Sequence, residues 1–154
     1  MADRLASRGM QHHPACLMCD QAQETTNHLL LLCVFTLQIW FSVFIQLHMA
    51  VDVPGNWASF LAWWRRVIRI APKELRKGLN SLIILVVWEI WKHRNACVFE
   101  DVLPNTRMLL QAINNECTMW RLTGASNLRD LLARLGVLGR LRFPGRFKFC
   151  LTWR

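Results

Sequence analysis

Three cysteines and one histidine near the N-terminus form the pattern of a metal site. Cys16, Cys19, His28 and Cys33 are spaced as C-x2-C-x8-H-x4-C. Two thiolates three positions apart in a turn can face one ion, and a histidine and a cysteine at the start of a following helix complete four ligands. Such a Cys3His set is typical of a closed structural zinc site, whereas a catalytic site keeps one position open for water. The pattern predicts structural Zn2+ that contributes to folding.

The motif allows other interpretations as well. Cys16 and Cys19 alone could be a redox pair or a chance pair, and His12 and His13 are competing donors. The first residues do not show the combination that marks an export signal, which is a basic start, then an apolar run, then a cleavage site with small residues. We therefore expect an intracellular protein of the nucleus or cytoplasm, not a secreted one, and in that reducing setting we expect thiolate ligands before disulfides.

Apolar residues recur at helical spacing along most of the chain, and no alternating run is long enough for a convincing sheet. The predicted fold class is mainly α, with a small Cys3His zinc knuckle leading into an irregular bundle of about four to five helices. The predicted divisions are a flexible N-terminus (1–13), a zinc-binding module with its following helix (14–50), a helical region (56–136) and a loosely ordered basic tail (137–154).

The start and stop signals place these helices. The first covers residues 29–47. Asn56 is the expected N-cap of the second, whose apolar face is predicted to hold Trp57, Phe60, Leu61, Trp64 and Ile68. The remaining helices are predicted to start at Pro72 and end near Lys92 and Arg94, to start after Pro104 and end near Gly124, and to run from an N-cap at Ser126 to Gly136.

Residues 29–47 hold no charged side chain and approach the length of a membrane span. Gln38, Ser42 and Gln46 recur every four positions, which on a helix forms one polar stripe. We therefore expect a buried or half-buried amphipathic helix. Membrane association through residues 29–47 is kept as a third hypothesis.

The positive charge is concentrated toward the C-terminus. The chain has a formal charge of +9, yet residues 1–120 carry 11 basic and 9 acidic side chains, while residues 121–154 carry 8 basic and 1 acidic. Such a tail attracts polyanions without reading sequence. In the body of the chain the candidate nucleic-acid contacts are Arg65, Arg66, Arg69, Lys92 and Arg94. The alternative for these residues is a solvated charged face and the basic end of a helix.

Two segments resemble a known family. Residues 16–40, CLMCDQAQETTNHLLLLCVFTLQIW, are similar to the reverse transcriptase zinc-binding domain at the C-terminal end of plant non-LTR retrotransposon polyproteins. The match includes the four candidate ligands, Glu24-Thr25, Leu29 and Trp40. Residues 86–100, VVWEIWKHRNACVFE, resemble the W-x2-W-K-x-R-N-x3-F helix that follows in those proteins. The resemblance implies zinc coordination by Cys16, Cys19, His28 and Cys33 and a role connected with nucleic acid.

The catalytic parts of such a polyprotein are missing from this sequence. The chain has no Tyr, so the Tyr-x-Asp-Asp turn of a polymerase cannot exist, and no phosphate-binding glycine loop is present. We expect a non-catalytic zinc-binding module derived from a retroelement, without a small-molecule substrate, that binds RNA or single-stranded DNA. The second hypothesis is a structural or protein-interaction remnant without affinity for nucleic acid. The oligomeric state is not predicted.

Overall fold

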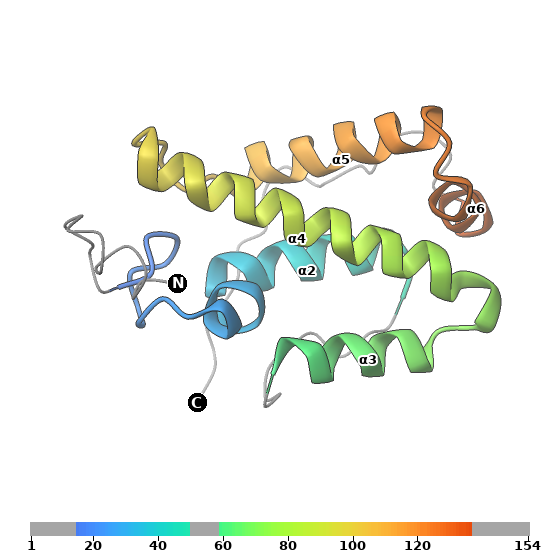
Figure 1. The fold of residues 1–154 in the computed structure, drawn as a ribbon, viewed down its shortest axis with the longest axis horizontal. Helices are drawn as coiled ribbons and strands as arrows, with labels where there is room; N and C mark the ends of the chain where they lie inside the picture. The colour runs from blue at the N-terminus through green and yellow to red at the C-terminus, as the bar shows by residue number, and fades with distance from the viewer. Residues whose placement is uncertain (1–14, 50–58, 137–154) are drawn as a thin grey trace.

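The computed structural model describes residues 15–49 and 59–136, which form helices around one long central helix (Figure 1). In chain order the elements are the π-helical turn η1 (His28–Leu32), α2 (Val34–Gln46), α3 (Phe60–Ile70), the 3-10 turn η2 (Lys73–Leu75), α4 (Arg76–Phe99), α5 (Thr106–Leu122) and α6 (Ser126–Arg134). Among the described residues the β pairing consists of one isolated bridge, Ala15 to Gln23. The predicted mainly α fold is confirmed. The predictions for 1–13, 137–154, His12 and His13 lie outside the described residues.

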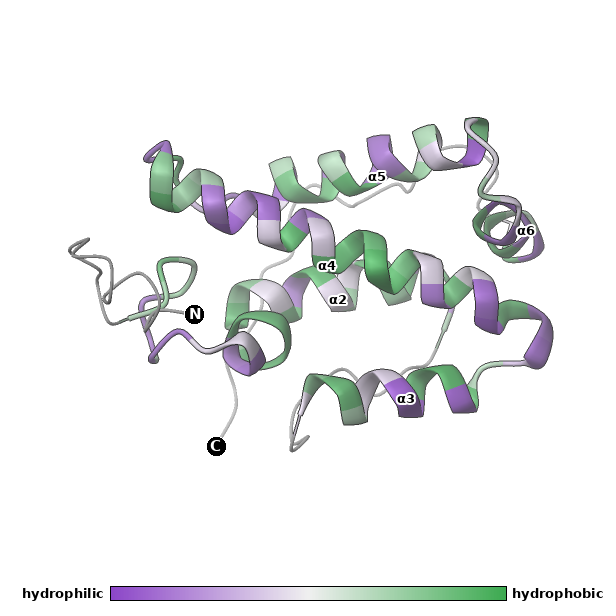
Figure 2. Ribbon diagram, viewed as in Figure 1, coloured by the Kyte–Doolittle hydropathy of each residue, from purple (hydrophilic) through white to green (hydrophobic). Residues whose placement is uncertain are grey.

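Helix α4 is the centre of the bundle. In Figure 1 α3 and α5 lie on opposite sides of it, and α6 lies across its N-terminal end. Its middle is strongly hydrophobic in Figure 2, and its apolar residues are buried on more than one side. The fully buried aliphatic residues of α4 are Leu79, Leu82, Ile83, Leu85, Val86 and Ile90. Because neighbours cover several sides of α4, its apolar residues do not form one narrow stripe.

The predicted bounds of this central helix were wrong at both ends. Pro72 precedes the turn η2 instead of opening the α-helix, which begins at Arg76. The helix also continues past Arg94 to Phe99. The basic residues that suggested a C-terminus therefore lie inside the helix.

The helix predicted over 29–47 is interrupted at Cys33. This residue has extended backbone (φ −63°, ψ 125°) between η1 and α2, and its N–H donates to the carbonyl of His28 at 2.7 Å. Side chains of α2 bond to carbonyls of η1: Thr36 Oγ1 donates to Leu29 at 2.7 Å and Trp40 Nε1 donates to Leu30 at 2.9 Å. These bonds satisfy carbonyl groups in η1, next to the interruption.

Within the described residues, no helix combines the length and the apolar character needed to cross a bilayer. Residues 29–47 form the interrupted η1–α2 segment, most of which is buried against the other helices. The polar stripe predicted on it is not its exposed face. Ser42 is buried and donates to the carbonyl of Gln38 at 2.7 Å, whereas Ile45 is 42% exposed.

Helix α3 starts later than predicted and turns a different face inward. Its N-cap is Ser59, whose Oγ accepts from the backbone N–H of Ala62 at 3.2 Å. The predicted cap Asn56 and the predicted apolar residue Trp57 lie outside the described residues. The buried face holds Phe60, Trp63 and Val67.

Aromatic packing against α2 explains this orientation of α3. The ring of Trp63 lies 4.9 Å from that of Trp40 and 6.0 Å from that of Phe44. The predicted residues Trp64 and Ile68 are only partly buried, and Leu61 is 55% exposed. The helix carries apolar residues on two adjoining faces, and contact with α2 selects one of them.

The last two helices agree with their local signals. Asn105 caps α5 through a bond from the N–H of Met108 at 3.1 Å, and the backbone of Gly124 has φ +108° just beyond the end of that helix. Helix α6 begins at Ser126, with Ala125 at the cap position instead of the predicted Ser126, and Gly136 follows its end. The predicted apolar residues Leu128, Leu131 and Leu132 are buried.

The crossing of α4 and α6 generates a prediction for Gly78. A Cβ at this position would collide with the carbonyl oxygen of Asn127 and lie 2.6 Å from Cβ of Leu131. Gly78→Ala should therefore lower the free energy of unfolding by about 1–3 kcal/mol, although alanine favours helix. Urea denaturation followed by circular dichroism measures the change. The control Ser81→Ala, at a partly exposed position of α4, should change stability little, and equal stability of Gly78→Ala and wild type would contradict this close crossing.

Candidate metal centre

A short turn places the first two thiols on one side of the chain. The N–H groups of Cys19 and Asp20 both donate to the carbonyl of Cys16, at 3.2 and 2.7 Å. Asp20 has φ +53°, a conformation that asparagine and aspartate tolerate in tight turns. The N–H of Cys16 donates to the carbonyl of Ala22 at 2.8 Å, which closes the loop beside the Ala15–Gln23 bridge.

The other two candidate ligands flank the turn η1. His28 is its first residue, and the His28 N–H donates to Oγ1 of Thr25 at 3.0 Å. Cys33 follows its last residue, at the interruption before α2. The neighbouring Asn27 accepts the N–H of Phe60 at 2.7 Å, so this segment also contacts the first turn of α3.

The four side chains converge. Their ligand atoms all lie within 4.8 Å of one another. Sγ of Cys16 is 3.9 Å from Sγ of Cys33, and Sγ of Cys19 is 3.3 Å from Nε2 of His28. Zn–S bonds of about 2.3 Å and Zn–N bonds of about 2.0 Å in a tetrahedron place sulfur atoms about 3.8 Å apart and sulfur and nitrogen about 3.5 Å apart. The donor set and these separations fit a zinc ion.

Two of the thiols share a proton and are shielded from water. Cys16 and Cys33 are both 0% exposed. The hydrogen bond from the Cys33 thiol, with help from the backbone N–H of Met18, lowers the pKa of Cys16 to about 5 against the opposing effect of burial. The same bond and burial raise the pKa of Cys33 above its ordinary value. Without a metal the pair therefore holds one negative charge and one proton, and a metal ion must displace that proton.

The comparison with protein families concerns this same segment. Residues 1–40 match the family model described as zinc-binding in reverse transcriptase. The resemblance predicted for the N-terminal motif is thereby confirmed, and the matched zinc-binding segment contains all four converging residues. Searches of curated proteins and of solved structures found no match.

A buried ion pair joins the zinc-binding segment to the central helix. Glu24, in the loop between Cys19 and His28, is 3% exposed, and Arg94 of α4 is 2% exposed. Nε of Arg94 lies 3.1 and 3.2 Å from the two carboxylate oxygens of Glu24, and Nη2 lies 2.5 Å from Oε1. The guanidinium also lies 5.8 Å from the ring centroid of Trp91. This two-nitrogen contact is among the strongest pairings that side chains form.

The buried pair corrects the prediction that Arg94 contacts nucleic acid. Its guanidinium is inside the protein and is neutralised by Glu24. The sequence alone could not reveal this partner, which is 70 positions away. The sequence nevertheless contained a signal for this contact. Glu24 belongs to the first of the two motifs that carried the family resemblance, and Arg94 belongs to the second.

Lys92 also has acidic partners. Its Nζ lies 2.6 Å from Oε1 of Glu89 and 3.6 Å from Oε1 of Glu116 on α5. The bond to Glu89 raises the pKa of Lys92. Lys92 therefore has two acidic partners, one on α4 and one on α5, and its side chain is 43% exposed. A contact of Lys92 with nucleic acid stays a prediction.

The remaining predicted contacts, Arg65, Arg66 and Arg69, are exposed on α3. Within the described part of the chain no carboxylate lies within ion-pair distance of Arg65 or Arg69. The structure therefore keeps these arginines together on one helix and separates them from Lys92 and Arg94.

The other described cysteines lack the surroundings of a nucleophile. Burial raises the pKa of Cys117 to about 12 and also raises that of Cys97. Nε2 of His93, the nearest histidine in sequence to Cys97, accepts the backbone N–H of Asn105 at 3.2 Å. Cys150 lies outside the described residues.

The buried pair yields a prediction about stability. Glu24→Gln leaves the Arg94 charge buried without a counter-ion and should cost about 3–5 kcal/mol of unfolding free energy. Arg94→Met should cost a similar amount, and the double variant should cost less than the sum, because it leaves no unpaired charge. Urea denaturation of the metal-loaded protein measures all three variants.

Asp130→Asn is the matched control for these variants. It breaks the solvent-exposed contact between Asp130 and Arg129, whose atoms lie 3.8 Å apart, and should change stability little. Additive effects of Glu24→Gln and Arg94→Met would show that the two side chains do not interact.

The shared proton yields a prediction about pH. Cys16, with its pKa of about 5, is already a thiolate near neutral pH, whereas Cys33 must release its proton when the metal binds. The apparent zinc affinity should therefore fall about tenfold per released proton for each pH unit of acidification. Competition with a chromophoric chelator between about pH 6 and 8, corrected for the chelator's own protonation, measures this slope. An affinity independent of pH in that range would contradict the shared-proton arrangement.

Proposed function

We propose that this chain is a non-catalytic zinc-binding module in which Cys16, Cys19, His28 and Cys33 hold one structural Zn2+. The observation that carries the proposal is the convergence of all four ligand atoms within 4.8 Å in the segment that matches the zinc-binding family. When bound, the ion would supply four strong bonds that join the Cys16–Cys19 turn to the two ends of η1. Four protein ligands leave no position for a reactive water, which is the arrangement of a structural site.

The protein's own residues hold the ligands ready for the metal. The Cys16–Cys19 turn and the interruption at Cys33 fix the positions of three thiols before the metal binds. The Glu24–Arg94 pair fixes the loop between Cys19 and His28 against α4. Zinc therefore stabilises a contact between the zinc-binding segment and the helical bundle.

We further propose that the module binds RNA or single-stranded DNA, as expected of a segment descended from a retroelement polyprotein. Arg65, Arg66 and Arg69 of α3 support this proposal, since they lie together and exposed on one helix. Arginine side chains in such a group bind phosphate oxygens and release counter-ions from the nucleic acid. The basic residues of 137–154 would add affinity without sequence preference.

Zinc content and nucleic-acid binding should be measured on one preparation of the full chain. The wild type should contain one equivalent of zinc by elemental analysis. Cys16→Ser and His28→Ala should each lose most of it, because each removes one of the four ligands. Cys97→Ser, which alters a cysteine outside the cluster, should keep it. A wild type without stoichiometric zinc, after purification with zinc present, would disprove the metal assignment.

The same preparation tests nucleic-acid binding by fluorescence anisotropy with a labelled single-stranded RNA. Arg65→Gln combined with Arg69→Gln should weaken binding and reduce the slope of log affinity against log salt by about 0.7 for each lost phosphate contact. An unchanged slope would remove α3 from the interface, and absence of binding by the wild type would favour a structural or protein-interaction role. Neither outcome affects the zinc assignment.

A further inference from the structure

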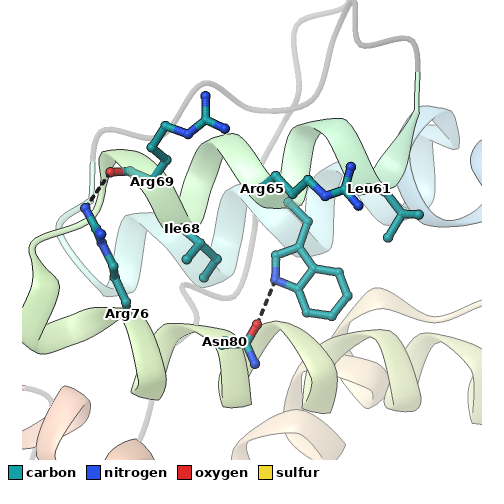
Figure 3. Close-up of a pocket in the computed structure, with 7 residues that line it drawn as sticks. Leu61, Arg65, Ile68, Arg69, Arg76 and Asn80 are labelled. Atoms are coloured by element: carbon teal, nitrogen blue, oxygen red, sulfur yellow. Dashed lines mark hydrogen bonds between the residues drawn. The ribbon is translucent and has the colours of Figure 1, made fainter.

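A groove between α3 and α4 combines an aromatic ring with positive charge. Its volume is about 520 Å³, and Figure 3 shows the side chains that line it. The lining residues are Leu61, Trp64, Arg65, Ile68, Arg69, Arg76 and Asn80. None of them is acidic, and three carry a guanidinium. The groove therefore favours an anionic ligand that also has an apolar surface.

The aromatic ring in this groove is held in one orientation. Trp64 is partly buried, and its Nε1 donates to Oδ1 of Asn80 across the groove at 3.1 Å (Figure 3). On the same helix its ring centroid lies 5.7 Å from that of Phe60. Because the indole is fixed before any ligand arrives, stacking of a planar group on it costs little additional side-chain entropy.

The cations take positions around this ring. Arg65 follows Trp64 directly, and Arg69 lies one helical turn further along, about 6 Å along the axis. Arg76 is fixed at the end of α3, where its Nε and Nη2 donate to the carbonyls of Ala71 and Arg69, both at 2.9 Å. Positive charge therefore lies both next to the stacking surface and at one end of the groove.

We propose that this groove binds single-stranded nucleic acid, with one base stacked on Trp64 and neighbouring phosphates contacted by Arg65 and Arg69. The inference rests on the proposed nucleic-acid role and adds where and in what form the strand is bound. Stacking platforms flanked by cations are a general means of holding single strands. In a duplex the faces of the bases are covered by their neighbours, so a duplex can use the arginines but not the indole.

The structure favours this groove over the aromatic and basic motif of α4. Trp88 is 54% exposed, but Arg94 is buried against Glu24 and Lys92 lies between two carboxylates. In the groove, by contrast, Arg65 and Arg69 have no carboxylate within ion-pair distance among the described residues. An acidic peptide would match the charge, but most of its residues offer no plane to stack on Trp64.

The test compares Trp64→Leu with wild type in the full, zinc-loaded chain. Labelled 12-residue oligonucleotides are titrated by anisotropy as single-stranded RNA, single-stranded DNA, duplex DNA and a strand whose central positions are abasic. We expect Trp64→Leu to weaken binding of both single strands about 5- to 100-fold and to leave duplex binding within about twofold. On the abasic strand the variant and the wild type should bind alike, because the group that stacks is absent. The basic residues of 137–154 are present in both the variant and the wild type, so the comparison of their affinities for one oligonucleotide reports the change at Trp64.

Two variants and one further measurement separate stacking from folding. Trp64→Phe keeps an aromatic face and should retain most of the single-strand affinity. Trp88→Leu removes an exposed tryptophan of α4 outside the groove and should change nothing. If Trp64→Leu fails to fold, as judged by circular dichroism and zinc content, photo-crosslinking of wild type to a 5-iodouracil strand decides, and the cross-link should map to Trp64.

Several results would overturn the groove assignment while leaving the proposed function standing. These are an equal loss of single-strand and duplex affinity in Trp64→Leu, unchanged single-strand affinity, and a cross-link that maps only outside α3 and α4. Displacement of the strand by polyglutamate at equal charge concentration would instead identify a site for acidic peptides. No binding of any strand by the wild type would refute the proposed nucleic-acid role itself.

Discussion

The buried pair of Glu24 and Arg94 is the contact on which the arrangement of this protein depends. Each charge is removed from water, and each would be strongly destabilising without the other. One comes from the loop between the metal ligands Cys19 and His28, and the other comes from the C-terminal part of the central helix, 70 positions later. The pair therefore crosses the predicted boundary between residues 14–50 and 56–136, and it makes correct docking of the two parts a condition for satisfying either charge.

The candidate metal centre and the interruption between η1 and α2 are one structural feature. A continuous helix over this segment would carry Cys33 around the helix surface, whereas extended backbone at Cys33 lets its thiol meet that of Cys16. Thr36 and Trp40 satisfy carbonyl groups beside the interruption. Trp40 is also part of the aromatic cluster with α3, so the bundle core supports the backbone geometry that the ligands need.

The basic residues in the body of this chain fall into two groups that the composition alone does not distinguish. Arg94 and Lys92 are engaged with Glu24, Glu89 and Glu116 and hold elements together. The arginines of α3 are exposed on one helix, and two of them, Arg65 and Arg69, border a groove containing an aromatic ring. A net charge of +9 therefore overstates the surface available to a polyanion in the body of the chain.

The sequence alone determined the features that depend on near neighbours. The candidate ligand set could be predicted because its spacing lies within one short segment, and α5 and α6 could be placed because apolar periodicity, Pro104 and two glycines act locally. The interruption at Cys33, the inward face of α3 and the burial of Arg94 were decided only by tertiary structure. Each depends on a partner that spacing cannot reveal: α2 side chains that bond to η1, Trp40 against Trp63, and Glu24 against Arg94. Local propensities leave such choices nearly equal in energy, and long-range packing and charge pairing select among them.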